Sequence, residues 1–154
     1  MDVARLVELN AAYARTIDNQ KYEEWPDFFL DRCLYKVTTA ENVAKGLEAG
    51  VIYADSRAML QDRISALRQA NIYERQRYRH IVGLPVILGA SDGAAEVETP
   101  FLIVRIMRDG KMEVFATGCY RDKVEPNGSG ALRFAERIVI CDGARFDTLV
   151  AIPF

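Results

Sequence analysis

The sequence contains a single histidine, His80, and this scarcity limits the metal chemistry of the chain. A mononuclear non-haem iron site of the facial-triad type needs two histidines and a carboxylate, and a Rieske cluster needs two cysteines and two histidines. A zinc site of the HExxH type also needs two histidines. None of these sites can be built here, so we expect no redox centre and no metal in this chain.

Cysteine is almost as scarce, and its spacing points to no disulfide framework. Cys33, Cys119 and Cys141 are an odd number and contain no CxxC pair. A zinc site combining them with His80 would have to be assembled from four positions, no two of which share a short loop. We therefore expect reduced, partly buried thiols that pack as small hydrophobic groups.

Other missing patterns exclude further classes of protein. No apolar run approaches the roughly 20 residues of a membrane-spanning helix, and the opening MDVARLVELN has acids where an export signal is basic and apolar. Lys and Arg number 20 against 22 acids, so no broad basic face for nucleic acid is expected. The nucleotide-binding motifs GxGxxG and GxxxxGK are absent. We expect a cytoplasmic globular protein with one domain over residues 1–154.

The hydrophobic pattern changes its period along the chain. Leu6, Leu9, Tyr13 and Ile17 recur at helical spacing and predict a helix over 2–18. Further helices are predicted over 21–30 and 56–71. Strands are predicted over these ranges: 33–39, 78–82, 86–88, 95–107, 111–124 and 131–141.

The three long strands at the end predict a meander, because Asp109-Gly110 is a strong hairpin signal. In the middle strand, alternation predicts one apolar or small face made of Met112, Val114, Ala116, Gly118 and Tyr120. A long sheet with helices on one side only must curl around them. The fold class expected is therefore α+β, with N-terminal helices packed in a long curved antiparallel sheet.

Five segments, in order along the chain, resemble the small (beta) subunits of Rieske-type aromatic-ring-hydroxylating dioxygenases. They are YARTIDNQKYEEWPDFFLDRCLYKV (13–37), YADSRAMLQDRISALR (53–68), RYRHIVG (77–83), ATGCYRDKV (116–124) and LRFAERIVICD (132–142). Within that family the chain is similar to subunits of dioxygenases for carboxylated rings, terephthalate among them.

The resemblance implies an NTF2-like (cystatin-like) cone, the fold of nuclear transport factor 2, scytalone dehydratase and ketosteroid isomerase. It implies an α3β3 hexamer with a beta trimer, in which the large alpha subunit holds a Rieske 2Fe–2S cluster and a mononuclear Fe(II). A separate reductase would deliver electrons from NADH. The chain itself would be a structural beta subunit with no catalytic, cofactor-binding or metal-binding residue.

Subunit contacts are expected where aromatic or apolar residues have no obvious place in the core. The closing segment FDTLVAIPF is too apolar for a free tail. We predict interface residues Trp25, Tyr120, Phe146, Pro153 and Phe154, because aromatic anchors are common at permanent interfaces.

Two alternatives use the same fold without a partner. The first is an isomerase or dehydratase that performs acid–base chemistry around His80, with Asp31 or Asp27 as the acid and Tyr13 or Tyr35 beside it. The second is a ligand-binding module with an empty apolar cavity. If bulky side chains fill the cone instead, His80 is a buried, hydrogen-bonded link between strand and helix.

Overall fold

A computed structural model describes residues 1–48, 50–69, 75–143 and 152–154. Within these residues, helices alternate along the chain with the strands of one large sheet. The helices are α1 (Val3–Asp18), the 3₁₀-helix η1 (Tyr22–Phe28), α2 (Ala40–Ala44) and α3 (Arg57–Gln69). The strands are β1 (Phe29–Thr39), β2 (Ile52–Ala54), β3 (Gln76–Val82), β4 (Val86–Ser91), β5 (Ala94–Met107), β6 (Met112–Pro126) and β7 (Leu132–Cys141).

The sheet has the order β2-β1-β7-β6-β5-β3, and β4 also pairs with β5. β3 and β4 therefore follow one another along the same side of β5 and form one edge, while β2 forms the other. The prediction of an antiparallel sheet is wrong at one position, because β1 and β7 are parallel. No hairpin joins these two strands, so no turn fixes their relative direction.

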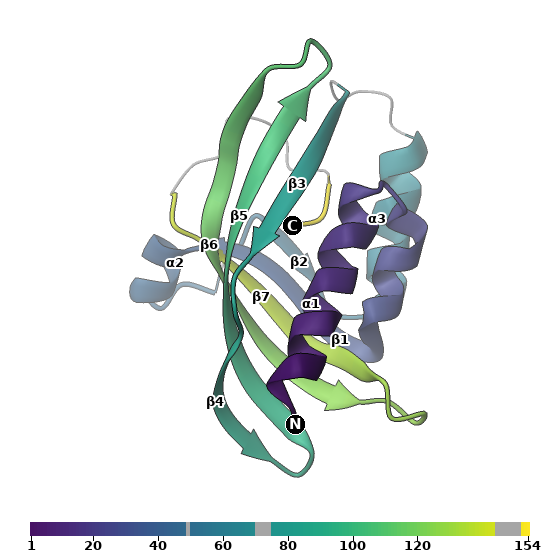
Figure 1. Cartoon of the computed structure of the whole chain (residues 1–154), viewed down its shortest axis with the longest axis vertical. Helices are drawn as coiled ribbons and strands as arrows, with labels where there is room; N and C mark the ends of the chain where they lie inside the picture. Colours follow the sequence, from purple (N-terminus) through teal and green to yellow (C-terminus); the bar gives the residue numbers. More distant parts are fainter. Residues whose placement is uncertain (49, 70–74, 144–151) are drawn as a thin grey trace.

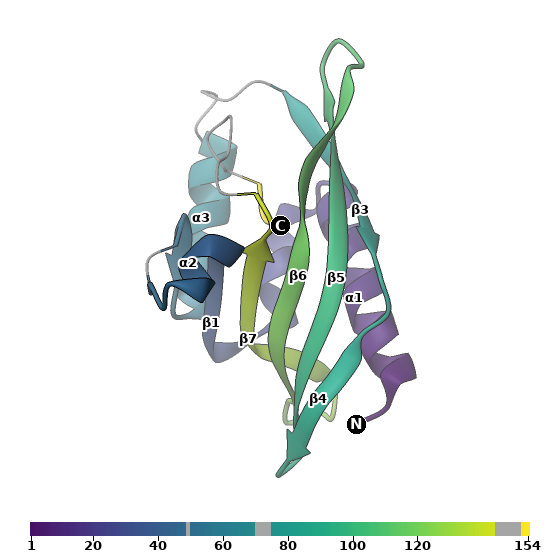
Figure 2. The ribbon, with the colours of Figure 1, turned by 90° about the vertical axis from the view of Figure 1, so that its left-hand side faces the viewer.

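The helices lie within the curve of the sheet, as Figures 1 and 2 show for α1 and α3. The predicted apolar stripe of α1 is buried, and the Asp2 carboxylate caps the helix by accepting from the Ala4 amide. α3 begins similarly, where the Ser56 hydroxyl accepts from the Met59 amide. The predicted arrangement, helices packed in a curved sheet, is confirmed. None of the described helices is long and apolar enough to cross a membrane.

The predicted alternation along β6 fails at a β-bulge. Ile103 pairs with Ala116 and Val104 with Val114, which leaves Phe115 as an extra residue. Because of this extra residue, the side chains before the bulge point to the opposite face from the one that the alternation predicts. Phe115 packs against the core, while Val114 and Met112 are exposed. The prediction that Met112 and Val114 share the face of Ala116 is therefore wrong.

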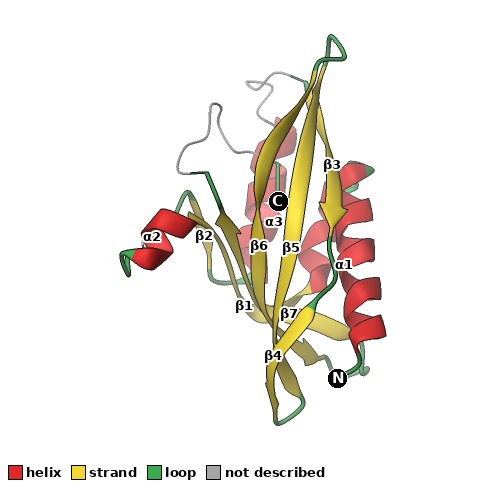
Figure 3. Ribbon diagram, turned by 60° about the vertical axis from the view of Figure 1, so that its left-hand side comes forward, coloured by secondary structure: helices red, strands yellow, loops and turns green. Residues whose placement is uncertain are grey.

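The segment 40–54, which falls in none of the predicted helices or strands, contains α2 and the short edge strand β2. In Figure 3, α2 extends away from the body of the sheet at the β2 edge. The predicted helix over 21–30 is instead a 3₁₀-helix that contains Pro26, and it gives way to β1 at Phe29.

Candidate functional site

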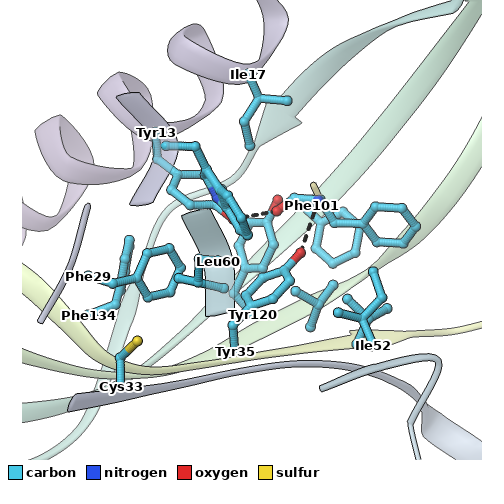
Figure 4. Close-up of a cluster of buried hydrophobic side chains, with 14 of the residues drawn as sticks. Tyr13, Ile17, Phe29, Cys33, Tyr35, Ile52, Leu60, Phe101, Tyr120 and Phe134 are labelled. Carbon is cyan, nitrogen blue, oxygen red and sulfur yellow. Dashed lines mark hydrogen bonds between the residues drawn. The ribbon is translucent and has the colours of Figure 1, made fainter. Parts of the chain in front are cut away.

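The space between the sheet and the helices is where an enzyme of this shape would hold a substrate, and aromatic side chains fill it. The Tyr13 ring lies near its centre (Figure 4). It makes edge contacts with Phe28, Phe29, Tyr120 and Phe134 at centroid distances of 5.5 to 6.4 Å. Such contacts stabilise a core beyond simple area burial. The interior is a packed core and not a substrate cavity.

Phe154 completes this packing and occupies the hydroxyl groups of two tyrosines. The Tyr13 hydroxyl donates to the main-chain oxygen of Phe154 at 2.5 Å, and the Phe154 amide donates to the Tyr35 hydroxyl at 3.1 Å. Burial raises the pKa of both tyrosines. The tyrosines that the acid–base alternative required are thus bound to the chain's own backbone.

A buried ion pair joins β6, β7 and α1 within the core. Arg137 donates to the two Asp122 carboxylate oxygens at 2.9 and 2.7 Å, and a further 2.6 Å bond runs to the Asn10 side-chain oxygen. The guanidinium carbon also lies 3.9 to 4.2 Å from the centroids of three rings, those of Tyr13, Tyr120 and Phe134. This pairing and the cation–π contacts compensate a charge with no access to solvent.

Burial and pairing act in opposite directions on this pair. Burial raises the pKa of Asp122, and the Arg137 charge opposes that rise. Burial alone would lower the pKa of Arg137, but Asp122 more than offsets it, so the guanidinium stays charged. Because Asp122 and Arg137 are hydrogen-bonded to each other, neither is available as an acid or a base for a substrate.

His80 takes part in a second buried pair, with Asp18 at the end of α1. Asp18 Oδ1 lies 2.6 Å from His80 Nδ1, and the His80 amide donates to Asp18 Oδ2 at 2.9 Å. His80 Nε2 is buried without a hydrogen-bond partner in the part of the chain that the structure describes. An acid that orients an imidazole is a familiar catalytic arrangement, yet here it joins α1 to β3 inside a filled core.

The predicted grouping around His80 is wrong in its acid. The Asp31 side chain is 83% exposed and pairs with Arg57, and Asp27 is also exposed. The structure therefore does not bring Asp31, His80 and Tyr13 together as a site. Sequence reasoning missed Asp18, although Asn10 and Asp18 lie eight residues apart on the buried side of α1.

The predicted interface residues are found in the core. Trp25, Tyr120 and Phe154 each have 0% exposure, and Pro153 is buried. Because these side chains pack inside their own chain, no partner subunit can reach them in this conformation. Phe146 lies outside the described residues, and its assignment stays a prediction.

The three thiols are free, and burial keeps them protonated near neutral pH. Burial raises the pKa of Cys33 to about 11 and that of Cys141 to about 12, and it also raises the pKa of Cys119. A protonated thiol is a poor nucleophile and a poor metal ligand. Across the described ranges, no group of three or more His, Cys, Asp or Glu side chains is placed to hold a metal ion.

Two apolar patches are exposed at opposite edges of the sheet. The edge patch, on β3 and β4 and between them, consists of Ile81, Leu84, Val86 and Leu88, each more than half exposed. The projection patch, around α2 and β2, consists of Val43, Leu47, Val51 and Tyr53. Clusters of exposed apolar side chains typically mark contacts with other proteins.

Comparisons with known proteins agree over almost the whole length. A model of the ring hydroxylating beta subunit family matches residues 12–148. Subunit beta 1 of the terminal oxygenase component of terephthalate 1,2-dioxygenase from Comamonas sp. is 52% identical, over 97% of this chain and 96% of that protein. The small subunit of anthranilate 1,2-dioxygenase from Burkholderia cepacia is 35% identical, over 94% and 89% of the two chains.

A solved structure shows the same similarity in three dimensions. A dioxygenase beta subunit from Novosphingobium aromaticivorans superposes with a TM-score of 0.90 at 37% sequence identity. The superposition covers 99% of this chain and 96% of that one. The similarity thus extends across the helices and the sheet together.

Proposed function

Since the chain belongs to the ring hydroxylating beta subunit family, we propose that it is the structural small subunit of a terminal oxygenase component, without a catalytic centre of its own. The oxygenase would cis-dihydroxylate an aromatic ring that carries a carboxylate, such as terephthalate. The 52% identity to a subunit of terephthalate 1,2-dioxygenase supports this substrate class.

The filled interior of the cone is the main observation that supports a subunit without a catalytic centre. Tyr13 and Tyr35 are hydrogen-bonded to Phe154, and Asp122 is paired with Arg137. An isomerase or dehydratase would need an open cavity beside an available acid or base. The packing does not favour that alternative, and the comparisons give it no support.

The catalytic metals of the complex would belong to the large alpha subunit. One histidine in 154 residues cannot supply the ligands of a Rieske cluster or of a mononuclear Fe(II). A separate reductase would pass electrons from NADH to the cluster. The complex would operate in the cytoplasm, and residues 1–154 would act in it as one domain.

The two apolar patches support an assembly with more than one contact per subunit. Two different patches, one at each edge of the sheet, suit a heterologous interface, which forms a closed ring when the rotation from one subunit to the next is closed. We propose that the edge patch and the projection patch contact neighbouring subunits in an α3β3 hexamer with a beta trimer.

Co-expression with and without the large subunit tests this function. Light scattering and iron analysis should show an iron-free assembly of the chain alone and an iron-containing hexamer with equal subunit numbers when both are present. If the chain remained unassociated beside a fully active large subunit, the structural role would be refuted.

Leu84→Asp tests the edge patch, because Leu84 is 74% exposed and its replacement should leave the core intact. The variant should keep the circular dichroism of the parent and fail to form the hexamer. Met59→Asp is the matched control, since Met59 is a partly exposed residue on α3 outside both patches. Normal assembly of Leu84→Asp would remove the edge patch from the proposed interface.

A further inference from the structure

A pocket lies where the ends of α1 and α3 meet the start of β3 and the end of β5. It has a volume of about 510 Å³, within the range of about 300–1,000 Å³ typical of small-molecule sites. Its lining residues include Tyr22, Leu67, Arg75, Arg77, Met107 and Arg108. Tyr22 and Leu67 also belong to the filled core, and no lining residue belongs to either apolar patch.

The cationic side of this pocket is only partly used by the fold. Arg68 is bound to Glu23 at 2.6 and 3.0 Å, and Arg77 donates to the main-chain oxygen of Asp18 at the end of α1. Arg75 and Arg108 are exposed and form no ion pair with any described residue. The guanidinium groups of Arg75 and Arg108 therefore remain available at this pocket. A guanidinium can donate two parallel hydrogen bonds to the two oxygens of one carboxylate.

The other side of the pocket is apolar. Met107 contributes a half-buried thioether, and behind it lie Leu67 and Tyr22, which are almost fully buried; the Arg68 guanidinium carbon lies 4.8 Å from the centroid of the Tyr22 ring. A thioether makes favourable contacts with aromatic groups. Gln76 adds a buried side-chain oxygen that has no hydrogen-bond partner among the described residues. This side of the pocket therefore also offers a hydrogen-bond acceptor.

We propose that this arginine pocket binds an aromatic carboxylate, with the carboxylate at Arg75 and Arg108 and the ring against the apolar wall. The choice of an aromatic body rests on the proposed function, in which the oxygenase acts on carboxylated rings. The pocket is then a second site for that class of compound, on the subunit that carries no catalytic centre.

Methyl NMR of the full chain labelled at methionine tests the proposal directly. Met107 lines the pocket, whereas Met59 lies near the other end of α3 and serves as the internal control. Terephthalate should shift the Met107 signal in a saturable way at millimolar concentration and leave Met59 unmoved. Benzamide, which is neutral, and acetate, which lacks the ring, should produce no comparable shift.

Substitution of the arginines identifies the site. Arg75→Gln and Arg108→Gln should each raise the terephthalate Kd roughly two- to fivefold, and the double variant should abolish binding at the same concentrations. Arg133→Gln, outside the pocket, is the control and should leave the Kd unchanged. Raising the salt concentration should weaken binding by screening.

Three results would overturn the proposal: no shift of Met107, an equal shift with benzamide or acetate, or an Arg75→Gln/Arg108→Gln variant that binds like Arg133→Gln. The assay uses the chain without the large subunit. A chain that assembles into the iron-containing hexamer but fails this assay refutes the pocket alone and leaves the proposed function standing.

Discussion

Two buried pairs of ionisable groups stabilise this fold, and they differ in the atoms that join the partners. Asp122 and Arg137 face each other inside the cone, whereas Asp18 and His80 join the end of α1 to β3. A guanidinium offers its donors in a planar fork, whereas an imidazole offers two ring nitrogens. The first pair is therefore a two-point contact between side chains, and the second joins one ring nitrogen and the His80 main-chain amide to one carboxylate.

The two pairs also differ in how completely they are supported. Arg137 is enclosed by three rings and bonded to Asn10 as well as Asp122. The His80 ring has one partner, Asp18, and one nitrogen of each side chain, His80 Nε2 and Arg137 Nη1, has no hydrogen-bond partner among the described residues. Removing a member of the first pair should break more contacts and therefore cost more stability.

Arg137→Met gives the largest expected effect. It removes the guanidinium and leaves the Asp122 carboxylate buried without its counter-ion, which should lower the free energy of unfolding by about 3–5 kcal/mol. Urea denaturation measures the change. In the double variant Arg137→Met/Asp122→Leu no charge remains, so most of the stability should return, and a double variant as unstable as Arg137→Met would contradict this account.

Asp18→Asn should have a smaller effect. Asparagine keeps the shape of the Asp18 side chain but removes the charged acceptor of the His80 ring and amide. The free energy of unfolding should fall by about 1.5–3 kcal/mol. The matched control is Asp31→Asn, an exposed acid that should change stability by no more than about 0.5 kcal/mol. Equal losses for the two variants would show that Asp18 has no special role.

Glu23→Gln removes an exposed ion pair, that of Glu23 with Arg68, and should have the smallest effect. It should lower the free energy of unfolding by up to about 1 kcal/mol. Arg68 lowers the pKa of Glu23 below its ordinary value of 4.5. The pair therefore stabilises the folded chain above about that pH, and its contribution is lost as the pH falls through the lower folded-state pKa. Urea curves of parent and variant should differ at pH 7 and converge in acid; a difference that persists in acid would exclude the ion pair as its cause.

The sequence pattern was a good guide wherever a feature depends on local periodicity. The buried stripe of α1 and the turn at Asp109-Gly110 follow from spacing and turn chemistry, and the structure contains both. The direction of β1 against β7 and the bulge at Phe115 were not predictable in this way. Both depend on which strands meet after the chain has folded back on itself.

The candidate site was predicted less well, for a related reason. The acid beside His80 was sought near the second helical segment, but it is Asp18 at the end of the first. Trp25 and Tyr120 were assigned to a surface because nothing in one sequence shows that Trp25 packs against Phe29 and Tyr35, or that Tyr120 covers the Arg137 guanidinium. A buried arginine in an otherwise ordinary strand is the signal that sequence reasoning overlooked.

The parallel pairing of β1 with β7 also affects how the chain acquires its structure during synthesis. β1 is made early, yet apart from the short β2 its neighbour in the sheet is β7, the last of the described strands to be synthesised. Contacts between segments so distant along the chain slow folding and leave apolar surface exposed meanwhile. The first helices and β1 must therefore remain incompletely covered until β7 has been made, so a product truncated before β7 would lack the strand that joins β1 to the rest of the sheet.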